Sequence, residues 1–135
     1  MTTLGVLAHN KKTLGGGLDA LRTALADTGH VDPPWREVAK SKEAPKQLRE
    51  LLADGVDRVL VWGGDGTVRR CIDTIVEDGA NAEVAILPAG TANLLANGLG
   101  IPIDLEGALE VALRGHLRKI DVGVMNGERF AVMAG

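Results

Sequence analysis

Residues 58–67 read RVLVWGGDGT, and this stretch sets the fold expected for the whole chain. Its first half, residues 58–62, is apolar and rich in β-branched side chains, which is typical of a strand buried on both faces. Its second half is a glycine turn. The apolar residues that follow fall at helical spacing: Val68, Ile72, Ile75 and Val76. The stretch therefore predicts a strand, a tight turn and a helix in direct succession.

The same alternation of strand and helix patterns extends along the chain. Apolar runs suited to buried strands lie at residues 4–8 and 84–87. Residues 35–39 are weakly patterned, and we expect a second strand there because Pro33-Pro34 forces extended backbone before them. Four further segments have apolar residues at helical spacing, which predicts helices with one face toward the core. These residues are Leu18, Leu21 and Leu25; Leu48, Leu51 and Leu52; residues 92–96; and Leu105, Ala108, Leu109, Ala112 and Leu113. Asp104 is the expected N-cap of the last helix, and Gly115 is expected to end it. This order predicts a three-layer α/β/α fold with a mostly parallel sheet.

The alternation of strand and helix patterns ends near the C-terminal end of the sequence. Residues 119–125 and 129–133 are extended runs joined by Asn126-Gly127, which is a strong signal for a β-hairpin. A hairpin is antiparallel, so we expect a nucleotide-binding α/β domain over residues 1–117. Residues 118–135 would then begin a second, β-rich domain, and we expect the chain to be cut inside a larger protein.

The composition excludes several classes of function. The chain has 135 residues with a net charge of −3, whereas a domain that binds nucleic acid non-specifically is clearly basic. One cysteine forms no intrachain disulfide, and three scattered histidines show no metal-ligand spacing. No apolar run approaches the roughly 18 residues of a membrane span. We therefore expect a cytoplasmic protein that binds no nucleic acid.

The turn GGDGT at residues 63–67 has the properties of an anion site. Gly63, Gly64 and Gly66 allow a close approach of backbone to ligand, and the following helix offers free N–H groups and the positive end of its dipole. A carboxylate beside a phosphate repels it unless a cation or a transferable proton intervenes. Asp65 therefore suggests Mg²⁺ or proton chemistry, although a turn-forming aspartate bonded to its own backbone remains the alternative.

A second turn, PAGTAN at residues 88–93, also joins a strand to a helix. Thr91 and Asn93 would contact phosphate there or simply cap the helix. In a parallel sheet this turn, the first turn and the loop at residues 10–17 all reach the carboxyl edge, where open α/β sheets bind ligands. Three glycine-containing loops at one edge predict a nucleotide site.

Two familiar nucleotide motifs are not matched. The chain has no GxxxxGK[ST], so it is no P-loop protein. The run at residues 15–17 lacks the third glycine of GxGxxG, and the acidic residue expected about 20 positions later, near Asp32 or Glu37, is not at a clear strand end. A dinucleotide dehydrogenase is weakly supported.

GGDGT at 63–67, followed by PAGTANLLANGLGIP at 88–102, resembles the catalytic domain of bacterial diacylglycerol kinases, which is related to sphingosine kinases. The first motif is shared with NAD kinases and resembles a phosphofructokinase loop, whereas the second selects the lipid kinases. The likeness extends from the first strand to residues 121–135. It implies ATP-dependent phosphorylation of a lipid hydroxyl, with diacylglycerol converted to phosphatidic acid.

The resemblance and the loop geometry together give a set of nucleotide-binding candidates. Asp65 is the catalytic candidate, and it is the possible contact to Mg²⁺ through the nucleotide. The binding candidates are Asn10, Lys11, Lys12, Thr13, Leu14, Ser41, Gly63, Gly64, Asp65, Gly66, Thr67, Val68, Arg69, Arg70, Gly90, Thr91 and Asn93. The family's general base and structural Mg²⁺ ligands lie in its second domain, so we expect this chain alone to be inactive.

The chain departs from the family pattern at two places. The family commonly has Asn-Pro in the first loop and Asn-Asp in the second motif, where this chain has Asn10-Lys11 and Asn93-Leu94. Lys11 or Lys12 would then offer phosphate a charge in place of backbone contacts.

Other functions and partners stay open at this point. An NAD kinase, a nucleotide-binding module without turnover and an interaction domain that binds no nucleotide are the alternatives. The expected partners are a lipid substrate, the inner membrane face as a peripheral contact of the full-length protein, and a second copy of the chain through the terminal hairpin.

Overall fold

The computed structural model describes residues 2–121 and 129–135. The strands are β1 (Leu4–His9), β2 (Trp35–Val38), β3 (Arg58–Gly63), β4 (Glu83–Pro88), β5 (His116–Asp121) and β6 (Arg129–Ala134). The helices are α1 (Gly17–Asp27), α2 (Ala44–Ala53), α3 (Asp65–Asp78), α4 (Leu94–Gly98) and α5 (Leu105–Arg114), with a 3₁₀ turn at Ser41–Glu43.

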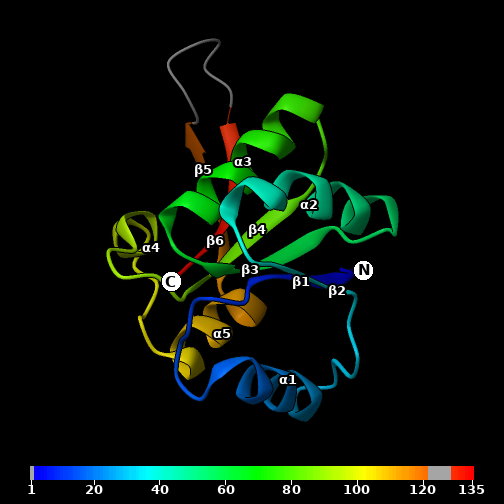
Figure 1. Cartoon of the computed structure of the whole chain (residues 1–135). Coiled ribbons are helices and arrows are strands. Elements are labelled where there is room, and N and C mark those ends of the chain that lie inside the picture. Colours follow the sequence, from blue (N-terminus) through cyan, green and yellow to red (C-terminus); the bar gives the residue numbers. More distant parts are fainter. Residues whose placement is uncertain (1, 122–128) are drawn as a thin grey trace.

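The strands form one sheet in the order β2-β1-β3-β4-β6-β5. Neighbouring strands run parallel except β5, which is antiparallel to β6. Helices α1 and α5 cover one face of the sheet, and α2 and α3 cover the other (Figure 1). The predicted three-layer α/β/α fold with a mostly parallel sheet is therefore confirmed.

Strand β3 lies in the middle of the core because almost every residue in it is apolar. Val59, Leu60, Val61 and Trp62 are fully buried, and all six residues of β1 beside it are buried too. Burial on both faces is what a parallel sheet between two helix layers requires. Strands β3 and β4 pair in register up to Gly63 and Pro88, so the turns after them leave the sheet at the same edge.

The end of the described chain extends this same sheet. Strand β6 pairs with β4 through Val84 and Val132, and β5 forms the outer strand. Helix α5 passes into β5 through Gly115, where a Cβ atom would lie 2.6 Å from the carbonyl oxygen of Ala134. Any residue with a Cβ atom would clash with this carbonyl oxygen, so the position requires glycine.

The antiparallel pairing predicted for the last two strands is confirmed, with different limits. Strand β5 begins at residue 116, three residues before the predicted start, because its pairing with β6 begins at His116 and Ala134, directly after Gly115. The predicted Asn126-Gly127 turn lies outside the described residues. A second domain beginning at residue 118 stays a prediction.

Helix α4 begins two residues later than the sequence predicts, at Leu94 instead of residue 92. Asn93 has a φ of 51°, in the left-handed region, so α4 cannot extend back through it. Among the helices of the described residues, none has the length and apolar character needed to cross a membrane.

Candidate functional site

The turns after β3 and β4 touch each other through two glycines. A Cβ atom placed on Gly90 would lie 2.5 Å from the Cα atom of Gly64, and one placed on Gly64 would lie 3.3 Å from the Cα atom of Gly90. Real Cβ atoms do not approach backbone as closely as the first of these distances. Glycine at position 90 therefore lets the two backbones meet, and the meeting point fixes the edge of the site.

The first turn feeds directly into α3. Gly64 precedes the helix in an extended conformation, and no side chain caps this end. The N–H of Val68 donates to the carbonyl oxygen of Gly64 at 3.1 Å, which is the first bond of the helix. The N–H groups before Val68 have no partner within a helix, and they lie at the positive end of a helix of 14 residues. Such an end favours an anion.

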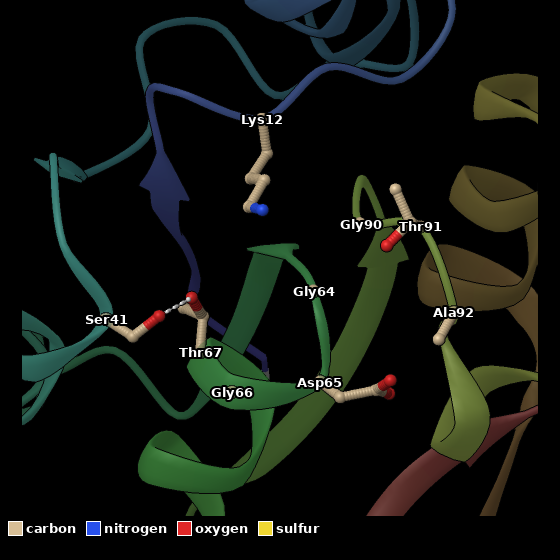
Figure 2. Close-up of a pocket in the computed structure, with 9 residues that line it drawn as sticks. All are labelled: Lys12, Ser41, Gly64, Asp65, Gly66, Thr67, Gly90, Thr91 and Ala92. Atoms are coloured by element: carbon tan, nitrogen blue, oxygen red, sulfur yellow. Dashed lines mark hydrogen bonds between the residues drawn. The ribbon is translucent and has the colours of Figure 1, made fainter.

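A pocket of about 150 Å³ lies between the two turns (Figure 2). We call it the glycine pocket, and it is lined by Lys12, Ser41, Gly64, Asp65, Gly66, Thr67, Gly90, Thr91 and Ala92. Sites that enclose a drug-sized ligand usually measure roughly 300–1,000 Å³. The glycine pocket therefore has the size of a chain of small polar groups, such as phosphates, and not of a whole nucleotide.

Two ionisable side chains line the glycine pocket, and they carry opposite charges. Figure 2 shows the Lys12 side chain extending from the first loop toward the glycine turn, and Asp65 at the start of α3 with its carboxylate turned away from Lys12. The N–H of Leu95 donates weakly to Asp65 Oδ1 at 3.4 Å, which holds the carboxylate on the α4 side. The pocket thus has a cationic wall at Lys12, and Asp65 lies at its border with the carboxylate toward α4.

The backbone of Lys12 is tied to the core by an indole. Trp62 is fully buried at the end of β3, and its Nε1–H donates to the carbonyl oxygen of Lys12 at 3.0 Å. The N–H of Lys12 in turn donates to the carbonyl oxygen of His9 at 3.1 Å. Two hydrogen bonds therefore fix the point from which the Lys12 side chain enters the pocket.

Ser41 and Thr67 close another side of the pocket. Their hydroxyl oxygens lie 2.9 Å apart and share a hydrogen bond, although the residues are 26 positions apart in the sequence. Ser41 begins the 3₁₀ turn, which the Glu43 carboxylate stabilises by accepting from the N–H groups of Ala39 and Lys40. These backbone donors hold the pKa of Glu43 below its usual value.

The second turn is held together by its own side chain. Asn93 Oδ1 accepts from the N–H of Gly90 at 3.1 Å, and Asn93 Nδ2 donates to the carbonyl oxygen of Gly90 at 2.9 Å. Asn93 is buried and does not line the glycine pocket. Thr91 is exposed, does not cap α4, and turns its hydroxyl toward the pocket (Figure 2).

The structure thus brings together eight of the residues chosen from the sequence, and it separates the others. The side chains of Leu14 and Val68 are buried in the core, and Gly63 lies behind the turn at the end of β3. The candidates that are exposed outside the glycine pocket are Asn10, Lys11, Thr13, Arg69 and Arg70. The backbone N–H of Lys11 donates to His9 Nδ1 at 3.2 Å, and Lys11 does not line the pocket. Ala92 was missed, and its place between Thr91 and Asn93 was the available signal.

Metal-ligating and nucleophilic groups elsewhere in the described residues do not form a competing site. No group of three or more His, Cys, Asp or Glu side chains that could hold a metal ion is found there. Cys71 is buried on the inner side of α3, and burial raises the pKa of its thiol to about 12. It is a core residue and not a reactive thiol.

The family model described as diacylglycerol kinase catalytic domain matches residues 7–125 of the chain. The chain belongs to this family.

Relatives with known names agree with the family assignment. Diacylglycerol kinases of Staphylococcus aureus strains JH9 and Newman are each 33% identical over 95 residues, which cover 70% of this chain and 30% of the relative. The crystal structure of a diacylglycerol kinase from Bacillus anthracis superimposes with a TM-score of 0.77 at 27% identity. That superposition covers 95% of this chain and 44% of the solved one. The chain therefore spans less than half the length of the relatives it matches.

Proposed function

We propose that this chain is the ATP-binding part of a kinase that transfers the γ-phosphate of ATP to a lipid hydroxyl, with diacylglycerol as substrate and phosphatidic acid as product. The observation that carries the proposal is the contact of Gly64 with Gly90, which sets the uncapped end of α3 and the second turn around one small polar pocket. Membership of the diacylglycerol kinase family supports the choice of reaction and substrate.

The roles of the residues follow from their positions. Backbone N–H groups of Gly66 and Thr67 bind phosphate oxygens at the positive end of α3, and the Thr91 hydroxyl donates from the facing turn. Lys12 supplies the positive charge that the other lining residues lack. Phosphoryl transfer depends mainly on positioning and electrostatic stabilisation, which is what this arrangement provides.

Asp65 is the candidate catalytic residue and the candidate contact to Mg²⁺. It is the one carboxylate among the residues that line the glycine pocket. Mg²⁺ in such sites is usually held by one or two carboxylates together with phosphate oxygens and water, so the residues present fit an ion that arrives with ATP. When bound, the ion neutralises charge on the phosphates. The Asp65 carboxylate lies on the α4 side of the pocket, away from Lys12.

The proposal extends to the complete gene product. The resemblance assigns the general base to a second domain, so we propose that residues 1–135 alone bind ATP without phosphorylating lipid. We further propose a cytoplasmic protein that meets its substrate at the inner membrane face as part of phospholipid synthesis. Strand β5 is at the edge of the described sheet, and an edge strand can pair with a second copy, which supports a homodimer.

The test is phosphorylation of a mixed-lipid panel and of NAD by the complete gene product with radiolabelled ATP. We expect label in diacylglycerol, and at least a ~100-fold loss of turnover in Asp65→Ala with little change in melting temperature, because removing one preorganised electrostatic group typically costs that much. Asp19→Ala is the matched control, since Asp19 lies in the first turn of α1 as Asp65 lies in the first turn of α3. Label in NAD alone would favour the NAD kinase alternative, and ATP binding without any product would favour a nucleotide-binding module.

A further inference from the structure

A second hollow, larger than the glycine pocket, lies beside α4. It has a volume of about 560 Å³ and is lined by Asp65, Gly66, Arg69, Leu94 and Leu95, and we call it the leucine hollow. Leu94 is 72% exposed, the most exposed large apolar side chain in the described residues. An apolar side chain held this far in solvent beside a catalytic candidate requires an explanation.

The leucine hollow and the glycine pocket share a wall. Asp65 and Gly66 line both of them. Figure 2 shows the Asp65 carboxylate directed away from Lys12, and the N–H of Leu95 donates to it at 3.4 Å from the α4 side. The first turn of α3 therefore separates the two spaces, with the carboxylate facing the leucine hollow.

The leucine hollow lies on the side of Asp65 from which an acceptor hydroxyl would approach the terminal phosphate. In phosphoryl transfer the attacking and leaving oxygens lie roughly in line on opposite sides of the phosphorus. A phosphate chain that enters from Lys12 and ends near Asp65 leaves its far side open toward the leucine hollow. The acceptor hydroxyl then reaches the terminal phosphate from the side of Leu94 and Leu95.

The chemistry of the hollow indicates what kind of acceptor fits. Its one basic residue, Arg69, pairs with Asp73 at 3.2 Å, so the charge of Arg69 already has a partner. Apolar contact stabilises in proportion to the surface removed from water. An uncharged alcohol with an adjoining hydrocarbon chain fits this surface, whereas a charged dinucleotide gains little from it.

We propose that the leucine hollow binds the apolar part of the lipid acceptor next to its reacting hydroxyl, and that Leu94 is its principal contact. This proposal rests on the proposed function. It adds a binding surface in the α/β domain for the second substrate, with Leu94 as a residue that determines specificity for lipid over polar alcohols.

The kinetic test uses the complete gene product with dioctanoylglycerol in detergent micelles. Leu94→Asn is expected to raise the KM for lipid at least fivefold while the KM for ATP changes less than twofold, and Leu94→Met is expected to keep both values. The matched control is Ile103→Asn, because Ile103 is 66% exposed and lines neither space. The control is expected to leave both KM values unchanged.

Two outcomes overturn the proposal. An unchanged KM for lipid in Leu94→Asn removes Leu94 from the acceptor site. A fall in melting temperature with both KM values raised together shows instead that Leu94 packs against another part of the protein.

A binding measurement keeps the question separate from turnover. Residues 1–135 are titrated with dihexanoylglycerol, and the backbone amide signals of Leu94, Leu95 and Arg69 are followed by NMR. Concentration-dependent shifts at these residues, lost in Leu94→Asn, support the hollow even if the wild-type protein phosphorylates no lipid. Absence of shifts overturns it even if lipid is phosphorylated.

Discussion

The turns after β3 and β4 begin alike and end differently. Both leave paired residues, Gly63 and Pro88, at the same edge of the sheet, and both contain the glycine through which they touch. The first turn continues straight into α3, a helix of 14 residues. The second folds back on itself through Asn93 and leads into α4, a helix of only 5 residues.

The different structures of the two turns suggest that the first binds the ligand and that the second positions the backbone around it. At the first turn the helix end has no side-chain cap, so its N–H groups remain for a ligand, and a long helix gives them a strong dipole. At the second turn the Asn93 side chain already bonds both polar groups of Gly90. We therefore propose that the first turn supplies most of the attraction for an anion, while the second fixes the width of the pocket.

The contact between the turns can be broken with one methyl group. Gly90→Ala would place a Cβ atom 2.5 Å from the Cα atom of Gly64, so we expect the backbones to separate. The expected cost is about 1–3 kcal/mol in free energy of unfolding, the usual range for overpacking. ATP affinity should fall at least tenfold, measured by isothermal titration calorimetry beside denaturant unfolding.

Gly98→Ala is the control for this change. Gly98 lies in α4, and a Cβ atom there would meet nothing within 4 Å. We expect unchanged ATP affinity and a gain of up to about 1 kcal/mol from helix propensity. Equal ATP binding by Gly90→Ala and Gly98→Ala would contradict the role given to the contact.

The fold of the second turn alone can be tested at Asn93. Asn93→Ala removes both hydrogen bonds to Gly90 and puts alanine at a φ of 51°. We expect a loss of about 1–3 kcal/mol in unfolding free energy, from the two partly buried bonds and the strained backbone together. Asn97→Ala, which removes an exposed bond to Ala92 from the same helix, should cost less. If the two variants are equally stable, Asn93 does not hold the turn.

The sequence predicted the first turn better than the second, for a physical reason. A buried β-branched strand followed by glycines and then by helical spacing leaves one local solution, and β3 and α3 formed where expected. The start of α4 was predicted two residues early because Thr91 looks like a helix cap. The bonds of Asn93 to Gly90 depend on a backbone conformation that no sequence spacing reveals.

Contacts between distant loops were predicted only in part. Ser41 was chosen by loose resemblance, and its bond to Thr67 comes from the packing of the 3₁₀ turn on α3. Lys11 and Lys12 could not be told apart, because both directly follow the first strand and only the folded structure shows that Lys12 lines the pocket. The bond from Trp62 to the Lys12 carbonyl was not predicted, because the two residues are 50 positions apart and no sequence spacing relates them.

That indole bond gives a way to weaken the cationic wall without touching either turn. Trp62→Phe removes the donor to Lys12 and leaves most of the ring in place. A hydrogen bond of this kind contributes about 1 kcal/mol. We expect ATP affinity to fall roughly threefold to tenfold, a smaller change than in Gly90→Ala.

Two further variants decide whether Trp62 acts through Lys12. Trp35→Phe removes a donor to Glu37 on β2, outside the pocket, and should leave ATP binding unchanged. In a Lys12→Met background, Trp62→Phe should cost much less than it does alone, since the two residues act as a unit. Fully additive effects on ATP affinity would contradict the tether.

The buried thiol of Cys71, on α3, makes the stability of the fold depend on pH. Burial raises the pKa of its thiol to about 12, against roughly 8.5 in an unfolded chain. Between these values the unfolded chain loses a proton that the folded chain keeps, so stability should decrease as pH rises above about 8.5. Cys71→Ala should remove this slope in denaturant titrations at pH 8 and pH 10.

The same thiol detects stabilisation of α3 by ligand. Labelling of native protein by a thiol reagent at pH 8 should be slow, because it requires opening of the helix, and ATP with Mg²⁺ should slow it further. Labelling as fast as in denaturant would show that Cys71 is not held in the core.

We propose that both turns bind the phosphates of one nucleotide. The most direct test is an NMR titration of residues 1–135 with Mg-ATP, in which the backbone amide signals of Gly66, Thr67 and Thr91 are followed. The account predicts saturable shifts at all three with one common affinity, and much weaker shifts with adenosine, which has no phosphate. Shifts confined to one turn, or equal shifts with adenosine, would contradict it.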